Sequence, residues 1–256
     1  MKVVVYLTVV SVLVFSTNGN VLKPYLNGRI FGGKPAKIEE YPYQIQLETN
    51  SGSFICGGSI ISPTVILTAA HCTNDQTVKS IIVRAGSAIR GKGGVVKTVK
   101  EKYVHEKYSV SDYDVSLLVL NEDLEFSSSI QSIPLPDESE YLKANKSAVT
   151  TGWGISDWGT GLLADNLQQV VEPIVEQEAC DNVYLGGITP RMVCAGYLDL
   201  GGTGACFGDS GGPLVSNNKQ HGIVSWGSGT CIQKGYPTVY TRVTAVREWI
   251  RSKVNI

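Results

Sequence analysis

From residue 44 onward, short apolar segments alternate with turn residues, and this pattern limits the folds that the chain can adopt. Residues 59–61 and 65–67, for example, flank the turn sequence Ser62-Pro63-Thr64. Further segments of this kind are 44–47, 81–83, 95–104, 117–120, 170–171, 222–224 and 239–240. Many short strands at close spacing predict a β-sandwich or a β-barrel and not a series of βαβ units.

The composition agrees with an all-β prediction. The 256 residues include 28 glycines and only 18% charged residues, which favours a loop-rich β fold over a helical bundle. One helix is predicted at residues 244–254, where Val246, Ile250 and Val254 recur at helical spacing. Residues 134–139 contain two prolines and indicate a boundary between two β-rich halves of similar size.

The N-terminal residues 1–19 have the order of a secretory signal peptide. Lys2 precedes an apolar run at residues 3–15, and small and polar residues follow it. A membrane anchor is the alternative, but the run is short for spanning a bilayer. We therefore expect a secreted, extracellular protein without a membrane partner. The net charge of −1 gives no indication of a nucleic-acid partner.

Six cysteines in a secreted chain are expected to form disulfides. Of the fifteen connectivities, the simplest pairs neighbours, as Cys56–Cys72, Cys180–Cys194 and Cys206–Cys231. Metal binding is less favoured, because there is no Cys-x-x-Cys and no histidine has ligand spacing to another. We expect neither a metal nor a cofactor. Asn145-Lys146-Ser147 is a sequon for N-glycosylation at Asn145.

The run Gly208-Asp209-Ser210-Gly211-Gly212 places a serine among glycines and raises the question of a nucleophile. An α/β-hydrolase would need an acid and then a histidine after the serine. His221 is the only histidine after Ser210, and no Asp or Glu separates them, so chain order excludes a lipase or esterase of that fold. The order histidine, acid, serine is met by His71, Asp114 and Ser210.

From Ile30 to its end, the chain resembles the chymotrypsin-like serine proteases. The shared motifs are Ile-x-Gly-Gly, TAAHC, YDVSLL, GDSGGP and VSWG, in that order. The resemblance implies a protease domain at residues 30–256, built from two packed six-stranded antiparallel β-barrels with the active site between them. It also implies protein or peptide substrates, protein protease inhibitors as candidate partners, and a monomer.

The resemblance gives each motif a catalytic role. A serine hydroxyl is a weak nucleophile, so Ser210 needs His71 as its base, and Asp114 orients the imidazole. The backbone N–H groups of Gly208 and Ser210 would form the oxyanion hole. Ser225 resembles the family serine that hydrogen-bonds the catalytic aspartate.

Arg29-Ile30 resembles the cleavage site of a zymogen, with residues 20–29 as its propeptide. In the family, cleavage frees an ammonium on the isoleucine, which pairs with the carboxylate before the nucleophile, here Asp209. A buried carboxylate and a buried ammonium each need such a partner. Arginine before the cut implies activation by a trypsin-like protease.

The primary specificity pocket is expected to be uncharged. Trypsin-like relatives carry an aspartate at the position of Gly204, and burying a basic side chain without one costs several kcal/mol. Gly227 matches a glycine that leaves one wall open, whereas Thr238 should shorten the pocket. Ser225 and Trp226 are also expected to bind the substrate. We expect small to medium apolar residues before the cleaved bond. Large aromatic residues are the alternative.

Residues 76–100 contain no Asp or Glu, so the calcium site of vertebrate relatives is not expected here. A solvated basic face is favoured there over a binding surface for an acidic partner. Its basic residues are Lys79, Arg84, Arg90, Lys92, Lys97 and Lys100.

A catalytically silent homologue that binds a partner or carbohydrate is the second function class, although no triad residue is missing.

Overall fold

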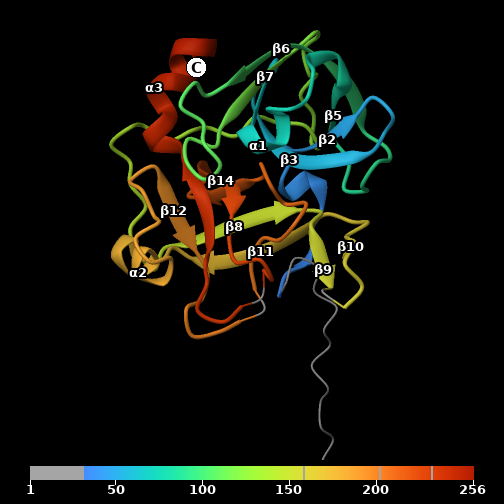
Figure 1. Cartoon of the computed structure of the whole chain (residues 1–256). Coiled ribbons are helices and arrows are strands. Elements are labelled where there is room, and N and C mark those ends of the chain that lie inside the picture. The colour runs from blue at the N-terminus through green and yellow to red at the C-terminus, as the bar shows by residue number, and fades with distance from the viewer. Residues whose placement is uncertain (1–31, 158, 202, 232) are drawn as a thin grey trace, which may run out of the picture.

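A closed six-stranded antiparallel barrel forms one half of the molecule. The computed structural model describes residues 32–157, 159–201, 203–231 and 233–256. The barrel lies at the upper right of Figure 1, to the right of the C-terminal helix, and its strand order is β2-β3-β4-β7-β6-β5. Their bounds are Gln44–Thr49, Phe54–Ser62, Val65–Thr68, Ser116–Leu120, Val95–Val104 and Ile81–Ala85.

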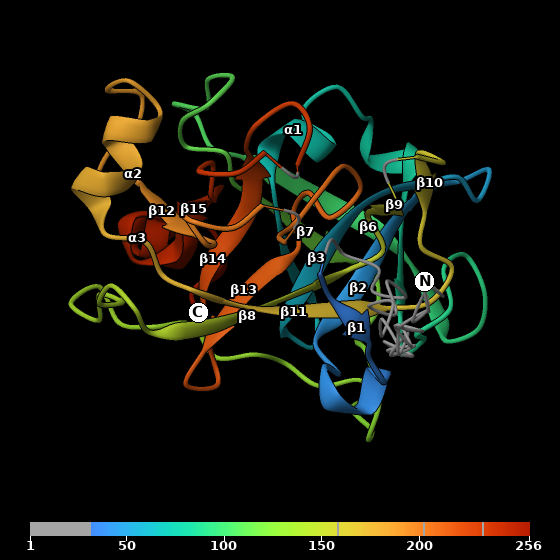
Figure 2. The same cartoon turned by 90° about the horizontal axis from the view of Figure 1, so that it is seen from below.

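A seven-stranded antiparallel sheet forms the other half, in the order β1-β11-β8-β13-β14-β15-β12. The bounds are Lys34–Pro35, Gln168–Pro173, Ser147–Gly152, Pro213–Ser216, Lys219–Trp226, Thr238–Arg242 and Met192–Ala195. The short strand β1 precedes the barrel in sequence but pairs with β11, so the chain runs from the second half into the first (Figure 2). Strands β9 (Ile155–Asp157) and β10 (Leu162–Leu163) form a separate pair.

Helices are few and short. α1 (Ala70–Thr73) is a single turn after β4, and α2 (Gln177–Val183) begins at Glu176, whose carboxylate accepts hydrogen bonds from two N–H groups of its first turn. α3 (Val243–Val254) ends the chain, and two 3-10 turns lie at Ile38–Glu40 and Val78–Ser80. In the part of the chain that the structure describes, no helix is long and apolar enough to cross a membrane.

The largest hydrophobic cluster fills the barrel and extends into α3. Leu47, Ile60 and Leu117 are fully buried within the barrel, and Val243 and Ile250 of α3 belong to the same cluster. The last helix of the chain therefore helps to cover the core of the first half. A smaller cluster in the second half includes Leu214, Val224 and Tyr240.

Three disulfides pair neighbouring cysteines, as the sequence favoured. Cys56–Cys72 joins β3 to α1, and Cys180–Cys194 joins α2 to β12. Cys206–Cys231 joins the loop of the expected nucleophile to the loop before β15. His71 lies beside the first pair, but those two sulfurs bond to each other and so offer no thiolate to a metal.

The all-β prediction and the C-terminal helix are confirmed. The strand segments proposed from the sequence fall within β2 to β7, β11, β14 and β15, whereas β1, β8, β9, β10, β12 and β13 are not predicted. The expected second six-stranded barrel takes the form of the seven-stranded sheet, because β1 adds to it. Residues 134–139 lie in the connection between β7 and β8.

The basic segment at residues 76–100 is largely neutralised by acidic neighbours. Within the barrel, Arg84 on β5 donates two hydrogen bonds to Glu48 on β2, from Nε to Oε1 at 2.6 Å and from a terminal nitrogen to Oε2 at 3.0 Å. Glu48 is fully buried. Other members of the segment also form ion pairs, namely Arg90–Asp165, Lys97–Glu122 and Lys100–Glu101. These contacts favour a solvated face over a binding surface for an acidic partner.

Arg84→Ala should lower the free energy of unfolding by ~3–5 kcal/mol, because it leaves the Glu48 carboxylate buried without a partner. Lys97→Ala is the matched control, since its partner Glu122 is 75% exposed, and it should cost only ~0–1 kcal/mol. Urea unfolding of both variants checks this. Equal costs would show that burial of Glu48 does not determine the energy of the pair.

Candidate active site

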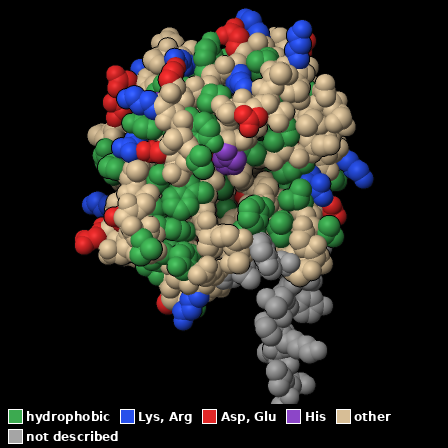
Figure 3. Space-filling view, in the orientation of Figure 1, with side chains coloured by type: hydrophobic (Ala, Val, Ile, Leu, Met, Phe, Trp, Pro, Cys, Tyr) green, Lys and Arg blue, Asp and Glu red, His purple; other side chains and the backbone are tan. Residues whose placement is uncertain are grey.

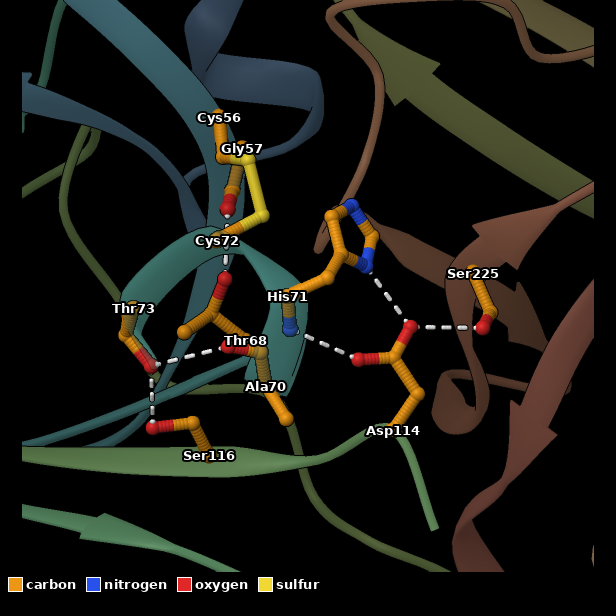
Figure 4. Close-up of a disulfide and its surroundings, with 10 residues drawn as sticks. All are labelled: Cys56, Gly57, Thr68, Ala70, His71, Cys72, Thr73, Asp114, Ser116 and Ser225. Atoms are coloured by element: carbon orange, nitrogen blue, oxygen red, sulfur yellow. Dashed lines mark hydrogen bonds and ion pairs between the residues drawn. A yellow bond between two sulfur atoms is a disulfide. The ribbon is translucent and has the colours of Figure 1, made fainter. Parts of the chain in front are cut away.

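The pairing of β4 with β7 brings His71 and Asp114 together. Thr68 at the end of β4 pairs with Ser116 at the start of β7, so His71 just after β4 lies near Asp114 just before β7. Nδ1 of His71 is 2.7 Å from Oδ2 of Asp114, and the backbone N–H of His71 donates to Oδ1 at 2.9 Å (Figure 4). The carboxylate therefore fixes both the ring and the backbone of His71.

The second half of the molecule also binds Asp114. Ser225 on β14 donates its hydroxyl to Oδ2 at 2.6 Å, and Thr241 on β15 donates to the backbone carbonyl of Asp114 at 2.8 Å. The Asp114 side chain is buried, whereas that of His71 is 32% exposed. Figure 4 shows the second ring nitrogen of His71 pointing away from the carboxylate, where it is free to exchange a proton with a reacting group.

The loop that carries Ser210 is held between the two halves. The Ser210 carbonyl accepts a hydrogen bond from Gly57 on β3 at 2.8 Å, and the N–H of Gly211 donates to Val224 on β14. Gly208 has φ +96°, and a Cβ there would lie 2.5 Å from Leu163, so this turn requires glycine. Ser210 and His71 line the same cavity.

Asp209 is a fully buried carboxyl next to Ser210. Its oxygens accept hydrogen bonds from the N–H groups of Gly154 and Cys206 at 2.8 and 2.9 Å. Burial raises the pKa of Asp209 to about 7, against the opposing effect of these two bonds. The expected cleavage site Arg29-Ile30, the signal peptide and the propeptide all lie outside the described residues.

A cavity of about 420 Å³ opens beside His71 and Ser210. Of the residues proposed for substrate binding, Ser225, Trp226, Gly227 and Thr238 line it, together with apolar neighbours that include Ala205, Val224 and Pro237. None of the described residues that line it is an Asp, Glu, Lys or Arg. On the face shown in Figure 3, hydrophobic and uncharged side chains predominate below the histidine.

Gly204 is not part of the cavity lining but precedes Ala205, which is. It has φ +133°, and a Cβ added there would lie 3.1 Å from Oγ1 of Thr238 and 3.3 Å from Oε1 of Glu172. Gly204, where an acidic side chain is lacking, is therefore in contact range of the Glu172 carboxyl.

The sequence analysis did not identify Glu172. It lies on β11 and is buried, while its neighbour Val171 is exposed, which reverses the usual arrangement of a strand with one solvated face. Neither carboxylate oxygen has a hydrogen-bond partner among the described residues. Burial raises the pKa of Glu172 to about 8, and the nearby Asp209 carboxyl adds to this shift. The Tyr240 hydroxyl is close by but outside hydrogen-bonding geometry, and it opposes the shift.

The remaining residues singled out in the sequence lie apart from this site. Asn145 is exposed in the turn before β8, where a glycan would be accessible. His105 is buried and stacks on Tyr113 with ring centroids 4.5 Å apart, and His221 is also buried. Burial lowers the pKa of both histidines.

Comparison with known proteins identifies the class to which this fold and site belong. Residues 30–250 match the family described as Trypsin, and the chain belongs to this family. It is 40% identical over 261 residues to Trypsin alpha of Drosophila melanogaster, covering 100% of this chain and 99% of that protein. It is 40% identical over 247 residues to Trypsin 5G1 of Aedes aegypti, covering 92% and 91%. Membership supports a serine protease whose substrates are proteins.

Glu172→Gln should make the protein more stable than the wild type at alkaline pH. The folded state raises the pKa of Glu172 from 4.5 to about 8, so it holds a proton that the unfolded chain releases. The contribution of this bound proton to the free energy of unfolding is complete below about pH 4.5 and is lost as the pH rises through 8.

Relative to Glu172→Gln, the wild type should therefore lose several kcal/mol of unfolding free energy over this range. Urea unfolding at a series of pH values measures the difference. Glu178→Gln, at an exposed carboxyl of α2, is the control and should leave the pH dependence unchanged. Parallel curves for wild type and Glu172→Gln would contradict the assignment.

Proposed function

We propose that the protein is a secreted serine endopeptidase that hydrolyses peptide bonds through an acyl-enzyme. The observation that carries the proposal is the 2.7 Å contact between His71 and a buried Asp114, on a histidine that shares a cavity with Ser210. Membership of the trypsin family supports the same reaction class. Because all three residue types are present in this arrangement, a catalytically silent binding homologue is less well supported.

In the proposed reaction, His71 takes the proton of the Ser210 hydroxyl as the oxygen attacks the substrate carbonyl, and then gives it to the leaving amine. Asp114 keeps the proton of the neutral ring on Nδ1 and stabilises the imidazolium that forms. The N–H groups of Gly208 and Ser210 stabilise the oxyanion. Water then attacks the acyl-enzyme, with His71 again as the base, and releases Ser210.

We propose that cleavage after Arg29 by a trypsin-like protease activates the enzyme. The new ammonium of Ile30 would pair with Asp209, whose buried carboxyl has N–H donors but no described cation beside it. Ion pairing would draw Asp209 into its charged form and fix the adjacent oxyanion loop. Residues 1–19 would direct secretion and 20–29 would be the propeptide, and protein protease inhibitors are the further partners proposed for this monomer.

The uncharged lining of the cavity supports a preference for small to medium apolar residues before the cleaved bond. Thr238 and Val224 line the cavity with short β-branched side chains, and Gly227 adds no side chain. Large aromatic residues are the alternative preference. A methylene group changes binding by only ~1–3 kcal/mol, so the selectivity should be broad.

A fluorophosphonate probe should label Ser210 after cleavage between Arg29 and Ile30 and should label the intact chain much more weakly. Ser210→Ala should abolish labelling, and Asp114→Asn should lower kcat by about 10⁴-fold through the wrong histidine tautomer. Mass spectrometry of the labelled peptide measures the first result, and peptide hydrolysis measures the second. A cleaved chain that takes up no label would instead be a silent homologue.

At about pH 6, where Glu172 is protonated, the activated enzyme should cleave a peptide library mainly after Ala, Val or Leu. A buried basic side chain would there lack a counter-charge. Sequencing the products gives the residue before each cut. Dominant cleavage after Lys or Arg at this pH would contradict the proposed pocket chemistry, and dominant cleavage after Phe or Tyr would establish the aromatic alternative.

A further inference from the structure

The buried carboxyl of Glu172 has no evident structural role. It lies beside the apolar cluster of the second half, which includes Ala205 and Tyr240, and in the part of the chain that the structure describes both of its oxygens lack hydrogen-bond partners. A buried polar group without partners costs free energy, and an apolar residue could fill the same volume on β11. A group kept at such a cost suggests a partner that is absent from the free protein.

Oε1 of Glu172 points toward the wall of the substrate cavity. It lies 3.3 Å from the position that a Cβ of Gly204 would occupy and 3.6 Å from the corresponding position at Gly196. Thr238, whose Oγ1 lies 3.1 Å from that same Gly204 position, lines the cavity. Because Gly204 has no side chain, none from this position stands between the carboxyl and the neighbouring Ala205 and Thr238, which line the cavity.

The groups that face Glu172 include no described base. Tyr240 on β15 lies nearby, and its hydroxyl is 2.9 Å from Oγ1 of Thr150 on β8. The other titratable neighbour is the carboxyl of Asp209. The Asp209 carboxyl disfavours an anion at Glu172, and the Tyr240 hydroxyl favours it but carries no positive charge, so a cation from outside the fold is the partner that would complete the site.

We propose that Glu172 is a specificity-determining residue that lets the cavity accept a basic substrate side chain, lysine or arginine, at alkaline pH. The inference rests on the proposed endopeptidase function and adds a second substrate class to the apolar one. The carboxyl would stand in for the acid missing at Gly204, but it approaches the Gly204 backbone from β11. Thr238 Oγ1 is the second oxygen available to the cationic tip.

The pH dependence follows from the proton on Glu172. With a pKa of about 8 in the free enzyme, the carboxyl is mostly neutral near pH 6 and suits an apolar substrate. A lysine substrate, with an ordinary pKa near 10.4, stays charged throughout, and its binding releases the Glu172 proton to solvent. Below the pKa of Glu172, this binding should strengthen about tenfold per pH unit.

The test compares two peptide substrates that differ only in Lys or Leu before the cleaved bond. With the activated enzyme, the ratio of kcat/KM for Lys over Leu should rise about tenfold per unit from pH 6 to 8 and then level off. Any effect of pH on the catalytic steps that the two substrates share cancels in the ratio. In Glu172→Gln the ratio should be low and flat, at least tenfold below wild type above pH 8.

The control variant Glu178→Gln removes an exposed carboxyl and should behave as wild type. Equal ratios in wild type and Glu172→Gln, or a ratio that does not change with pH, would overturn the inference while leaving the endopeptidase intact. If neither substrate is cleaved and Ser210 takes up no fluorophosphonate, the proposed function itself fails.

A second measurement needs no variant and so does not depend on the folding of Glu172→Gln. n-Butylammonium, a mimic of the lysine side chain, should inhibit cleavage of the Leu substrate competitively, with an inhibition constant that falls about tenfold per unit from pH 6 to 8. Butanol, its neutral counterpart, should show no such change. Identical pH profiles for the two inhibitors would contradict a role for Glu172.

Discussion

The buried carboxylate of Asp114 is the point on which the two halves of the molecule converge. It accepts hydrogen bonds from the His71 backbone, the His71 ring and the hydroxyl of Ser225, and these come from the barrel and from β14. A buried anion with several donors tolerates little displacement, because each lost bond leaves charge unsatisfied. The orientation of the imidazole therefore depends on the correct docking of two separately built β structures.

The loop around Ser210 shows the same dependence. Its backbone bonds to β3 on one side and to β14 on the other, and the neighbouring Asp209 is fixed by N–H groups from the loop itself and from Gly154. Ser210 thus lies between the two halves and not in the interior of either. A seam gives access to an extended substrate while the supporting bonds remain buried.

Much of the site could be predicted from the sequence because its residues lie in contiguous motifs. His71, Asp114 and Ser225 were proposed from TAAHC, YDVSLL and VSWG, and the structure places them within hydrogen-bonding distance in one chain of contacts. The strands β1, β9 and β10 were missed because each is only two or three residues long. The strands β8, β12 and β13 were missed because serine, threonine, alanine or proline weakens their apolar pattern.

Glu172 was missed for a different reason. The charge of the pocket was predicted from residues near Ser210 in sequence, whereas the fold brings the Glu172 carboxyl to Gly204 from β11. Only the reversed burial of two neighbours, with Val171 exposed and Glu172 buried, could have signalled this contact.

The position of α3 has a consequence for biosynthesis. Val243, Val246 and Ile250 belong to the hydrophobic cluster that fills the N-terminal barrel, although they follow its last strand, β7, far along the chain. A nascent chain that has emerged only as far as β7 has all six barrel strands but lacks this apolar cover. The barrel should consequently remain incompletely packed on the ribosome until α3 has been made and has left the exit tunnel.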